Sequence, residues 1–375
     1  MAIFALQPVA FGAWLVRIPE VQQALSLGPA ELALALLGMP IGTLIMLPIA
    51  SRLAARFGPV AIIRYGFLLF LALASFPVWA ATPFLLFCAL AALGGSMSLL
   101  ELGMNVTADA IERSGRRLIM TTCHGFWSVG IMLGALLGTI LAALTVPPHW
   151  AVLLVAVASL PVALWLTSAL PVVAAPDHAT PRQKAGLPGK RLIGISVFVF
   201  GVTMTEGAMA DWSALYLRDI FGIGAGSAGL GYVVFAGMVA AGRFIGDGLM
   251  ARIGVLALAR LCGGSALVGM VFLLLAPNVV IAVIGLGCIG VGVSVGFPIG
   301  VTAVAGLKDR PVASSVATLT FIALLGFLAG PPMIGIIAEY SNLRYGLGML
   351  LPALLVSFAL IPFLRSDKRP LPLTR

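Results

Sequence analysis

The sequence predicts an all-α polytopic membrane protein, with twelve transmembrane helices in two six-helix pseudo-symmetric bundles. Three observations predict this fold class: an apolar composition, twelve apolar runs of similar length, and one polar break near the middle. Of the residues, 61% are hydrophobic and only 9% are charged, and the mean hydropathy is +1.13. Soluble domains carry roughly 25% charged residues, so the composition excludes a soluble core.

Each apolar run is close to the roughly 20 residues that a helix needs to cross the hydrocarbon core of a bilayer. Short segments with prolines, glycines and charges separate the runs. We expect helices at residues 3–22, 30–51, 60–80, 83–108, 118–145, 149–170, 192–217, 226–250, 256–277, 279–305, 312–337 and 344–365.

The basic residues predict the orientation, because Lys and Arg near helix ends are retained on the cytoplasmic side. The loops of one side hold only Arg17, Arg218 and Arg344. The net charge of +9 therefore reflects topology rather than affinity for nucleic acid, and both termini should be cytoplasmic. The other loops and the C-terminal tail hold Arg52, Arg56, Arg113, Arg116, Arg117, Arg182, Lys184, Lys190, Arg191, Arg252, Lys308, Arg310, Arg365, Lys368 and Arg369.

A polar segment at 171–191 interrupts the apolar rhythm with prolines, glycines and basic residues, as expected of a flexible cytoplasmic connector. It divides an N-terminal bundle, 1–170, from a C-terminal bundle, 192–365, which a cytoplasmic tail, 366–375, follows. The chain begins almost directly with its first helix, so we expect no removable signal peptide, although Met1 need not be the true start.

The two halves are similar in sequence at corresponding positions, since LAARFG at 53–58 corresponds to LMARIG at 249–254. Two six-helix repeats joined by a cytoplasmic loop resemble the major facilitator superfamily over nearly the whole chain. The loop between the second and third helices keeps Leu53, Arg56 and Gly58 of the superfamily's pattern but has Ala55 where an acid is usual. A more specific resemblance, to the MosC-like branch of bacterial inner-membrane proteins, rests on GAWLVRIPE (12–20), ELGMNVTADAIER (101–113), CHGFWSVG (123–130), EGAMADW (206–212), GFP (296–298) and AGPPMIG (329–335).

Acidic residues inside the predicted spans are the main functional candidates, because a charge at mid-bilayer costs about 2.5–3.5 kcal/mol on insertion scales. Glu206 and Asp211 lie in the seventh span. They are five residues apart, so their faces differ by about 140° and we expect only one to face a cavity, unless the helix is broken near Gly207. Glu101 and Asn105 lie on one helical stripe, with Glu101 deep in the bilayer.

Three pairings are expected between these polar residues. His124 should lie at the depth of Glu101, as its hydrogen-bond partner or as part of a proton relay. Arg17 and Asp211 should pair and gate the outer mouth, because two desolvated opposite charges stabilise each other. Arg243 and Asp247 are four residues apart and should pair locally, or gate the inner mouth.

Aromatic residues complete the predicted substrate site. Trp14, Trp127 and Trp212 lie within spans beside polar residues and could stack on a sugar ring or attract a cation. With Asn105 and Glu206 they form the expected substrate-binding set, while Glu101, His124 and Glu206 are the candidates for proton coupling. The four cysteines are scattered without ligand spacing, which indicates packing and no metal site.

A nucleotide-binding loop, a dinucleotide fingerprint and the HExxH motif are all missing, so we expect neither an enzyme nor a cofactor. The sequence therefore favours a proton-coupled secondary transporter of a small polar solute, such as a sugar, a polyol or the amino-inositol that the MosC resemblance implies. The partners would be the solute, the proton gradient and the lipid bilayer, and we expect a monomer. Two alternatives stay open: efflux of hydrophobic cations, and a receptor or scaffold that transports nothing.

Overall fold

The computed structural model describes residues 1–115, 119–171, 187–307 and 310–365, and within these ranges it is entirely helical. Twelve helical spans are long and apolar enough to cross a membrane. Every predicted span is found, most with ends within a few residues of the prediction, and the second span extends further, to Phe57. The predicted fold class is confirmed. The connector at 171–191 and the tail at 366–375 lie mostly or wholly outside the described residues.

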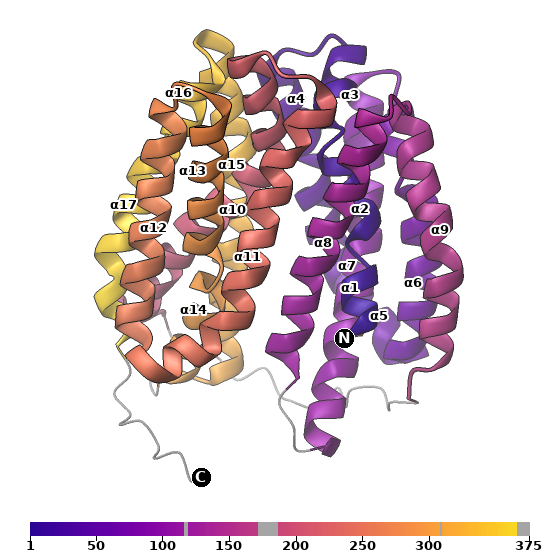
Figure 1. Ribbon diagram of the computed structural model, residues 1–375. Coiled ribbons are helices and arrows are strands. Elements are labelled where there is room, and N and C mark those ends of the chain that lie inside the picture. Colours follow the sequence, from indigo (N-terminus) through magenta and orange to yellow (C-terminus); the bar gives the residue numbers. More distant parts are fainter. Residues whose placement is uncertain (116–118, 172–186, 308–309, 366–375) are drawn as a thin grey trace.

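The first six spans contain nine α-helices and one 3-10 helix, which lie together on one side of the molecule (Figure 1). They are α1 (Ala2–Leu6), α2 (Val9–Leu15), α3 (Ile18–Ala24), α4 (Pro29–Leu36), α5 (Gly38–Phe57), α6 (Pro59–Leu73), η1 (Phe76–Trp79), α7 (Pro83–Gly115), α8 (Met120–Ala143) and α9 (Pro148–Ser168).

The other six spans form the second bundle (Figure 1). They are built from α10 (Lys190–Phe221), α11 (Ala225–Ile253), α12 (Val255–Leu275), α13 (Val279–Val293), α14 (Gly296–Ala305), α15 (Val312–Tyr340), α16 (Leu343–Gly348), α17 (Leu350–Leu360) and η2 (Ile361–Leu364).

Several spans are interrupted, and the interruptions of the first and tenth spans have a clear local cause. The first span divides into α1, α2 and α3, with Pro8 at the first break and Pro19 in the first turn of α3. A proline lacks a backbone N–H, so it fits a helix start better than a helix interior. The tenth span breaks between α13 and α14, at Ser294 and Val295, and Pro298 follows in the first turn of α14.

Glycines allow close packing between helices within each bundle. A Cβ on Gly130 would lie 1.9 Å from the carbonyl oxygen of Ala5, and one on Gly134 would lie 2.0 Å from that of Val9. Such contacts between backbones are typical of membrane helices, which gain stability from packing rather than from a hydrophobic effect.

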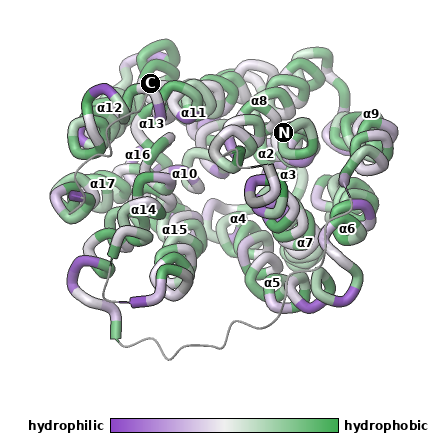
Figure 2. The backbone as a smooth tube through the Cα atoms, turned by 90° about the horizontal axis from the view of Figure 1, so that it is seen from below, coloured by the Kyte–Doolittle hydropathy of each residue, from purple (hydrophilic) through white to green (hydrophobic). Residues whose placement is uncertain are grey.

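The two bundles also contact each other. We call the end where α9 finishes and α10 starts the linker side, and the opposite end the far side. At the far side, Arg218 of α10 donates to the carbonyl oxygen of Pro19 at 2.6 Å and to Oε1 of Gln22 at 2.5 Å. The backbone N–H of Ala30 donates to the Glu339 carboxylate at 3.1 Å. These contacts hold the far side closed, and Figure 2 shows both bundles from the linker side.

Candidate functional site

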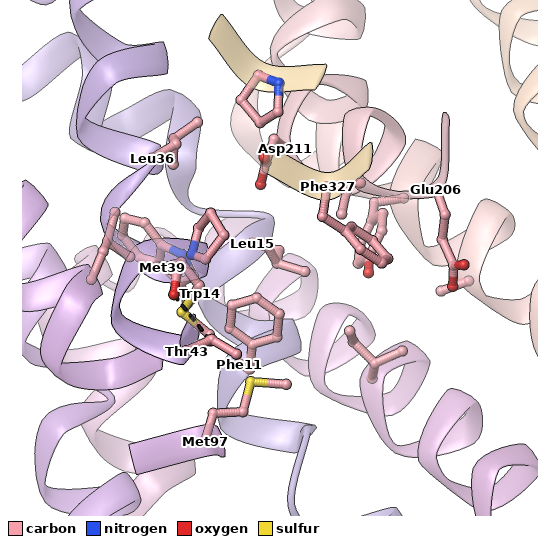
Figure 3. A pocket seen from close by; sticks show the side chains of 18 of the residues that line it. Phe11, Trp14, Leu15, Leu36, Met39, Thr43, Met97, Glu206, Asp211 and Phe327 are labelled. Atoms are coloured by element: carbon pink, nitrogen blue, oxygen red, sulfur yellow. Dashed lines mark hydrogen bonds between the residues drawn. The ribbon is translucent and has the colours of Figure 1, made fainter. Parts of the chain in front are cut away.

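A cavity of about 250 Å³ lies between the two bundles near the middle of the spans. Its lining comes from α2, α4, α5, α7 and α8 on one side and from α10, α11 and α15 on the other (Figure 3). We call it the central cavity. It is lined by Phe11, Trp14, Leu15, Leu36, Met39, Pro40, Thr43, Leu90, Met97, Glu101, Trp127, Ser128, Ile131, Glu206, Gly207, Ala210, Asp211, Tyr232, Phe235, Ala236, Val239, Leu324, Phe327 and Pro331.

Three acids line the central cavity: Glu101, Glu206 and Asp211. The expectation that only one of Glu206 and Asp211 faces a cavity is wrong. Helix α10 is unbroken, but residues of α11 and of α15 both contribute to the lining, so the cavity extends around more than one face of α10. The lining contains no Lys, Arg or His, so the cavity is suited to cations and neutral solutes and opposes anions.

Glu206 is the acid with a partner. Its Oε1 accepts from a terminal nitrogen of Arg243 at 2.9 Å, and both side chains are largely buried. Neither Glu101 nor Asp211 forms a hydrogen bond or ion pair with another described residue. An ionised carboxylate is costly in such a place unless a positive charge or a proton joins it. These two carboxyl groups are therefore the ones available to bind a proton or a cationic group.

Arg243 connects four elements. From α11 it binds Glu206 of α10, donates to Oγ of Ser128 in α8 at 2.6 Å, and donates from Nε to the carbonyl oxygen of Ser294 at 3.4 Å. Ser128 belongs to the first bundle and the other contacts to the second. Arg243 therefore links the bundles and also supports the break between α13 and α14.

A second cavity, of about 300 Å³, lies toward the linker side, and we call it the inner cavity. It shares no lining residue with the central cavity. Its polar side chains come from the start of α8, the second half of α11 and, with Thr302, from α14. Its lining is Met120, His124, Arg243, Gly246, Asp247, Met250, Leu258, Val295, Phe297, Pro298, Ile299, Val301 and Thr302.

The predicted substrate-binding residues divide into two groups. Trp14, Trp127 and Glu206 line the central cavity, and Trp127 donates from Nε1 to Oε1 of Gln7 at 2.8 Å. Trp212 is fully buried in the packed core and Asn105 lines neither cavity, so neither contacts a solute held in the central cavity in this conformation.

The predicted pair between Arg17 and Asp211 is wrong. Arg17 is fully buried and forms an ion pair with Glu20 at 2.6 Å. It also donates to the carbonyl oxygens of Gly138 and Val146 at 3.3 and 2.5 Å, near the end of α8. Because α2 ends just before Arg17, its side chain points to the α8 end rather than across to α10. Arg17 thus fixes the broken first span, and Arg218 and Glu339 supply the contacts that close the far side.

Two further predicted pairs are also absent among the described residues. His124 lines the inner cavity and makes an edge contact with the ring of Phe4, with centroids 5.7 Å apart, whereas Glu101 lines the central cavity. Arg243 bonds to Glu206, which is largely buried, and not to Asp247, which is exposed, because an ion pair is stronger where less water surrounds it. His124, Arg243 and Asp247 do share the inner cavity.

The sequence analysis missed several residues of the site. Tyr232 and Phe327 line the central cavity, and nothing in their apolar surroundings distinguishes them in the sequence. Thr43 lies in the cavity wall and donates to the carbonyl oxygens of Met39 and Gly94. No group of three or more metal-ligating side chains exists within the described part of the chain.

The chain belongs to the Major Facilitator Superfamily, whose family profile matches residues 2–321. It is 31% identical over 346 residues to the membrane protein MosC of Rhizobium meliloti, covering 91% of this chain and 83% of MosC. It is also 31% identical over 348 residues to an uncharacterized MFS-type transporter of Yersinia pestis, covering 92% of this chain and 89% of that protein. The predicted resemblance to the MosC-like branch is confirmed.

Solved structures share the fold. A crystal structure of a mutant of the nucleoside transporter NupG aligns with a TM-score of 0.77 at 12% identity, covering 97% of this chain and 98% of that one. The Escherichia coli fucose:proton symporter FucP aligns with a TM-score of 0.65 at 18% identity, covering 97% of each chain. Family and fold together indicate a membrane transporter rather than an enzyme.

Proposed function

We propose that this chain is a proton-coupled secondary transporter that moves a small polar solute, such as a sugar, a polyol or an amino-inositol-like compound, by alternating access. The observation that carries the proposal is the pair of unpartnered carboxylates, Glu101 and Asp211, in a cavity between two bundles. A carboxylate there favours a proton or a cationic group, and a carboxylate that gains and loses a proton can couple transport to a gradient.

The lining supports a solute with both polar and apolar faces. Trp127 and Phe327, which are partly exposed, present aromatic surfaces on which a sugar ring can stack, and the acids can accept hydrogen bonds from hydroxyl or amine groups. Trp14 and Tyr232 also line the cavity but are almost fully buried. The symporter FucP, which is named for fucose and protons and shares the fold, makes this solute class a reasonable starting point.

The placement of the contacts supports alternating access. The far side is held closed by Arg218, Glu339 and the close approach of Gly226 in α11 to Ala143 in α8, while the inner cavity lies at the linker side. We propose that the linker side is cytoplasmic, with both termini there, in a bacterial inner membrane. The first bundle (1–170) would then rock against the second (192–365) about the central cavity, within a monomer.

A second candidate is efflux of hydrophobic cations. The mostly apolar, aromatic lining with unpartnered acids favours it, because a lipophilic cation is stabilised both by contact with the aromatic faces and by the nearby carboxylates. The third reading, a receptor or scaffold that moves nothing, has no feature of the cavity in its favour, because a scaffold gains nothing from two unpartnered acids.

Ligand-induced thermal stabilisation of the purified protein tests these functions, because a ligand that binds the folded state raises the apparent unfolding temperature. The panel contains inositols, amino-inositols, hexoses and lipophilic amines. We expect a narrow polyol or sugar response that Asp211→Asn removes and that Glu31→Gln, outside both cavities, leaves intact. Broad stabilisation by lipophilic amines would instead establish the efflux function, and no response to any compound would contradict both.

A further inference from the structure

The Arg243 contacts lie between the two cavities. Glu206 and Ser128, which accept hydrogen bonds from Arg243, line the central cavity, whereas Arg243 lines the inner cavity. The cavities share no lining residue. The guanidinium of Arg243 therefore lies at the boundary between the two cavities.

The contacts of Arg243 are short and charge-assisted, but water still reaches part of the ion pair. The side chains of Arg243 and Glu206 are 13% and 17% exposed, so the pair is only partly desolvated. Charge-assisted hydrogen bonds of 2.6 and 2.9 Å hold the guanidinium to both bundles at once. Neutralising Glu206, by a proton or by a cationic group of the solute, would remove the charge that keeps Arg243 in this position.

Another acceptor for Arg243 is already in place. Asp247 lies one turn along the same helix, lines the inner cavity with Arg243 and is exposed there. Residues four apart on a helix are neighbours, with Cβ atoms about 5–6 Å apart. Asp247 forms no hydrogen bond or ion pair with any other described residue, so its carboxylate is available.

We propose that Arg243 is a gate between the two cavities. When it is bound to Glu206 and Ser128 the cavities are separate, and when it is bound to Asp247 they are connected. The exchange also frees Ser128 and so loosens α8 of the first bundle from α11 of the second. Arrival of positive charge in the central cavity would thereby open the route to the linker side. This inference rests on the proposed transport function and assigns its inner gate to one side chain with two partners.

The two carboxylates make opposite predictions. Glu206→Gln removes the charge that keeps the Arg243 gate closed, so Arg243 moves to Asp247 and the cavities become connected. Asp247→Asn removes the open-state partner, so Arg243 stays on Glu206 and the cavities remain separate. Arg243→Lys should also open the path, because one ammonium cannot reach three acceptors as a planar guanidinium does.

The test is labelling of Ala210→Cys, in the central cavity, by the impermeant thiol reagent MTSET added to inside-out vesicles. The full chain is used, with Cys88, Cys123, Cys262 and Cys288 replaced by serine. We expect Glu206→Gln to speed labelling by roughly tenfold, the ratio that corresponds to about 1.4 kcal/mol, and Asp247→Asn to slow it. Glu31→Gln, which also loses one carboxylate but lines neither cavity, should match the unsubstituted reporter.

A second reporter, Thr302→Cys in the inner cavity, should label at the same rate in every variant. If Glu206→Gln fails to fold, Ser128→Ala replaces it and should give a smaller increase at Ala210→Cys. Equal labelling of Ala210→Cys in Glu206→Gln and Asp247→Asn would overturn the proposal, as would slow labelling of Thr302→Cys. Labelling requires no solute, so the gate proposal can fail while transport is retained. Equally, transport can be absent while the Arg243 gate opens and closes as described.

Discussion

Gly226 offers a direct perturbation of the closed far side. It lies in the first turn of α11, and a Cβ there would lie 2.7 Å from Cα of Ala143 and 2.9 Å from its backbone nitrogen, at the end of α8. These atoms belong to the other bundle and to its backbone, so no side chain can move aside. Gly226→Ala should therefore push the bundles apart at the far side.

The expected magnitude follows from the geometry. Overpacking of this kind costs about 1–3 kcal/mol. The cost falls only on the conformation in which α8 and α11 touch at the far side, so it shifts the equilibrium toward the outward-open state by about 5- to 150-fold. Gly264→Ala in α12 is the control, because a Cβ there meets nothing within 4 Å.

Accessibility from the far side measures this shift. In right-side-out vesicles, labelling of Ala210→Cys by MTSET should be faster with Gly226→Ala and unchanged with Gly264→Ala. Unfolding of both variants is followed to establish that they are folded. Equal labelling rates for the two folded variants would refute the reasoning, because the far side would then not be closed by the contact between α8 and α11.

Three further outcomes are expected. Arg17→Ala should lower the free energy of unfolding by about 3 kcal/mol, because it strands Glu20 and two carbonyl acceptors; a change within about 0.5 kcal/mol, as for a surface residue, would contradict this. Trp127→Phe should cost about 1 kcal/mol by denaturant unfolding, because buried Gln7 loses its indole donor, and an unchanged midpoint would show that the bond contributes nothing. Glu101→Gln should keep solute binding in the thermal assay but lose acceleration of uptake by an imposed pH gradient; retained acceleration would remove Glu101 from proton coupling.

The spans and their order follow from the sequence because they depend on local composition. An apolar run of about 20 residues has few alternatives in a bilayer, where backbone groups must be satisfied within the helix. Glu206 and Glu101 were predictable for the same reason, since an acid in such a run is costly wherever the helix is placed. Both line the central cavity.

The partners of the charged residues were less predictable, because they depend on the rotation of each helix. Arg243 has Asp247 at a favourable helical spacing, yet Glu206 on α10 binds it. Glu20 lies three residues after Arg17, a spacing that allows an ion pair along the chain, but the predicted pairing of desolvated charges assigned Asp211 instead. Tyr232 and Phe327 carry no signal, because an aromatic residue in a membrane helix faces lipid, core or cavity with the same sequence pattern.

The central claim is that this chain couples solute movement to proton movement through unpartnered acids in the central cavity. It is tested most directly in proteoliposomes that contain a pH-sensitive dye, by adding the solute identified in the thermal panel without an imposed pH gradient. The account predicts a solute-dependent change in luminal pH with the unsubstituted protein and none with Glu101→Gln or Asp211→Asn. Solute uptake without any proton movement, or an equal pH change in those two variants, would contradict it.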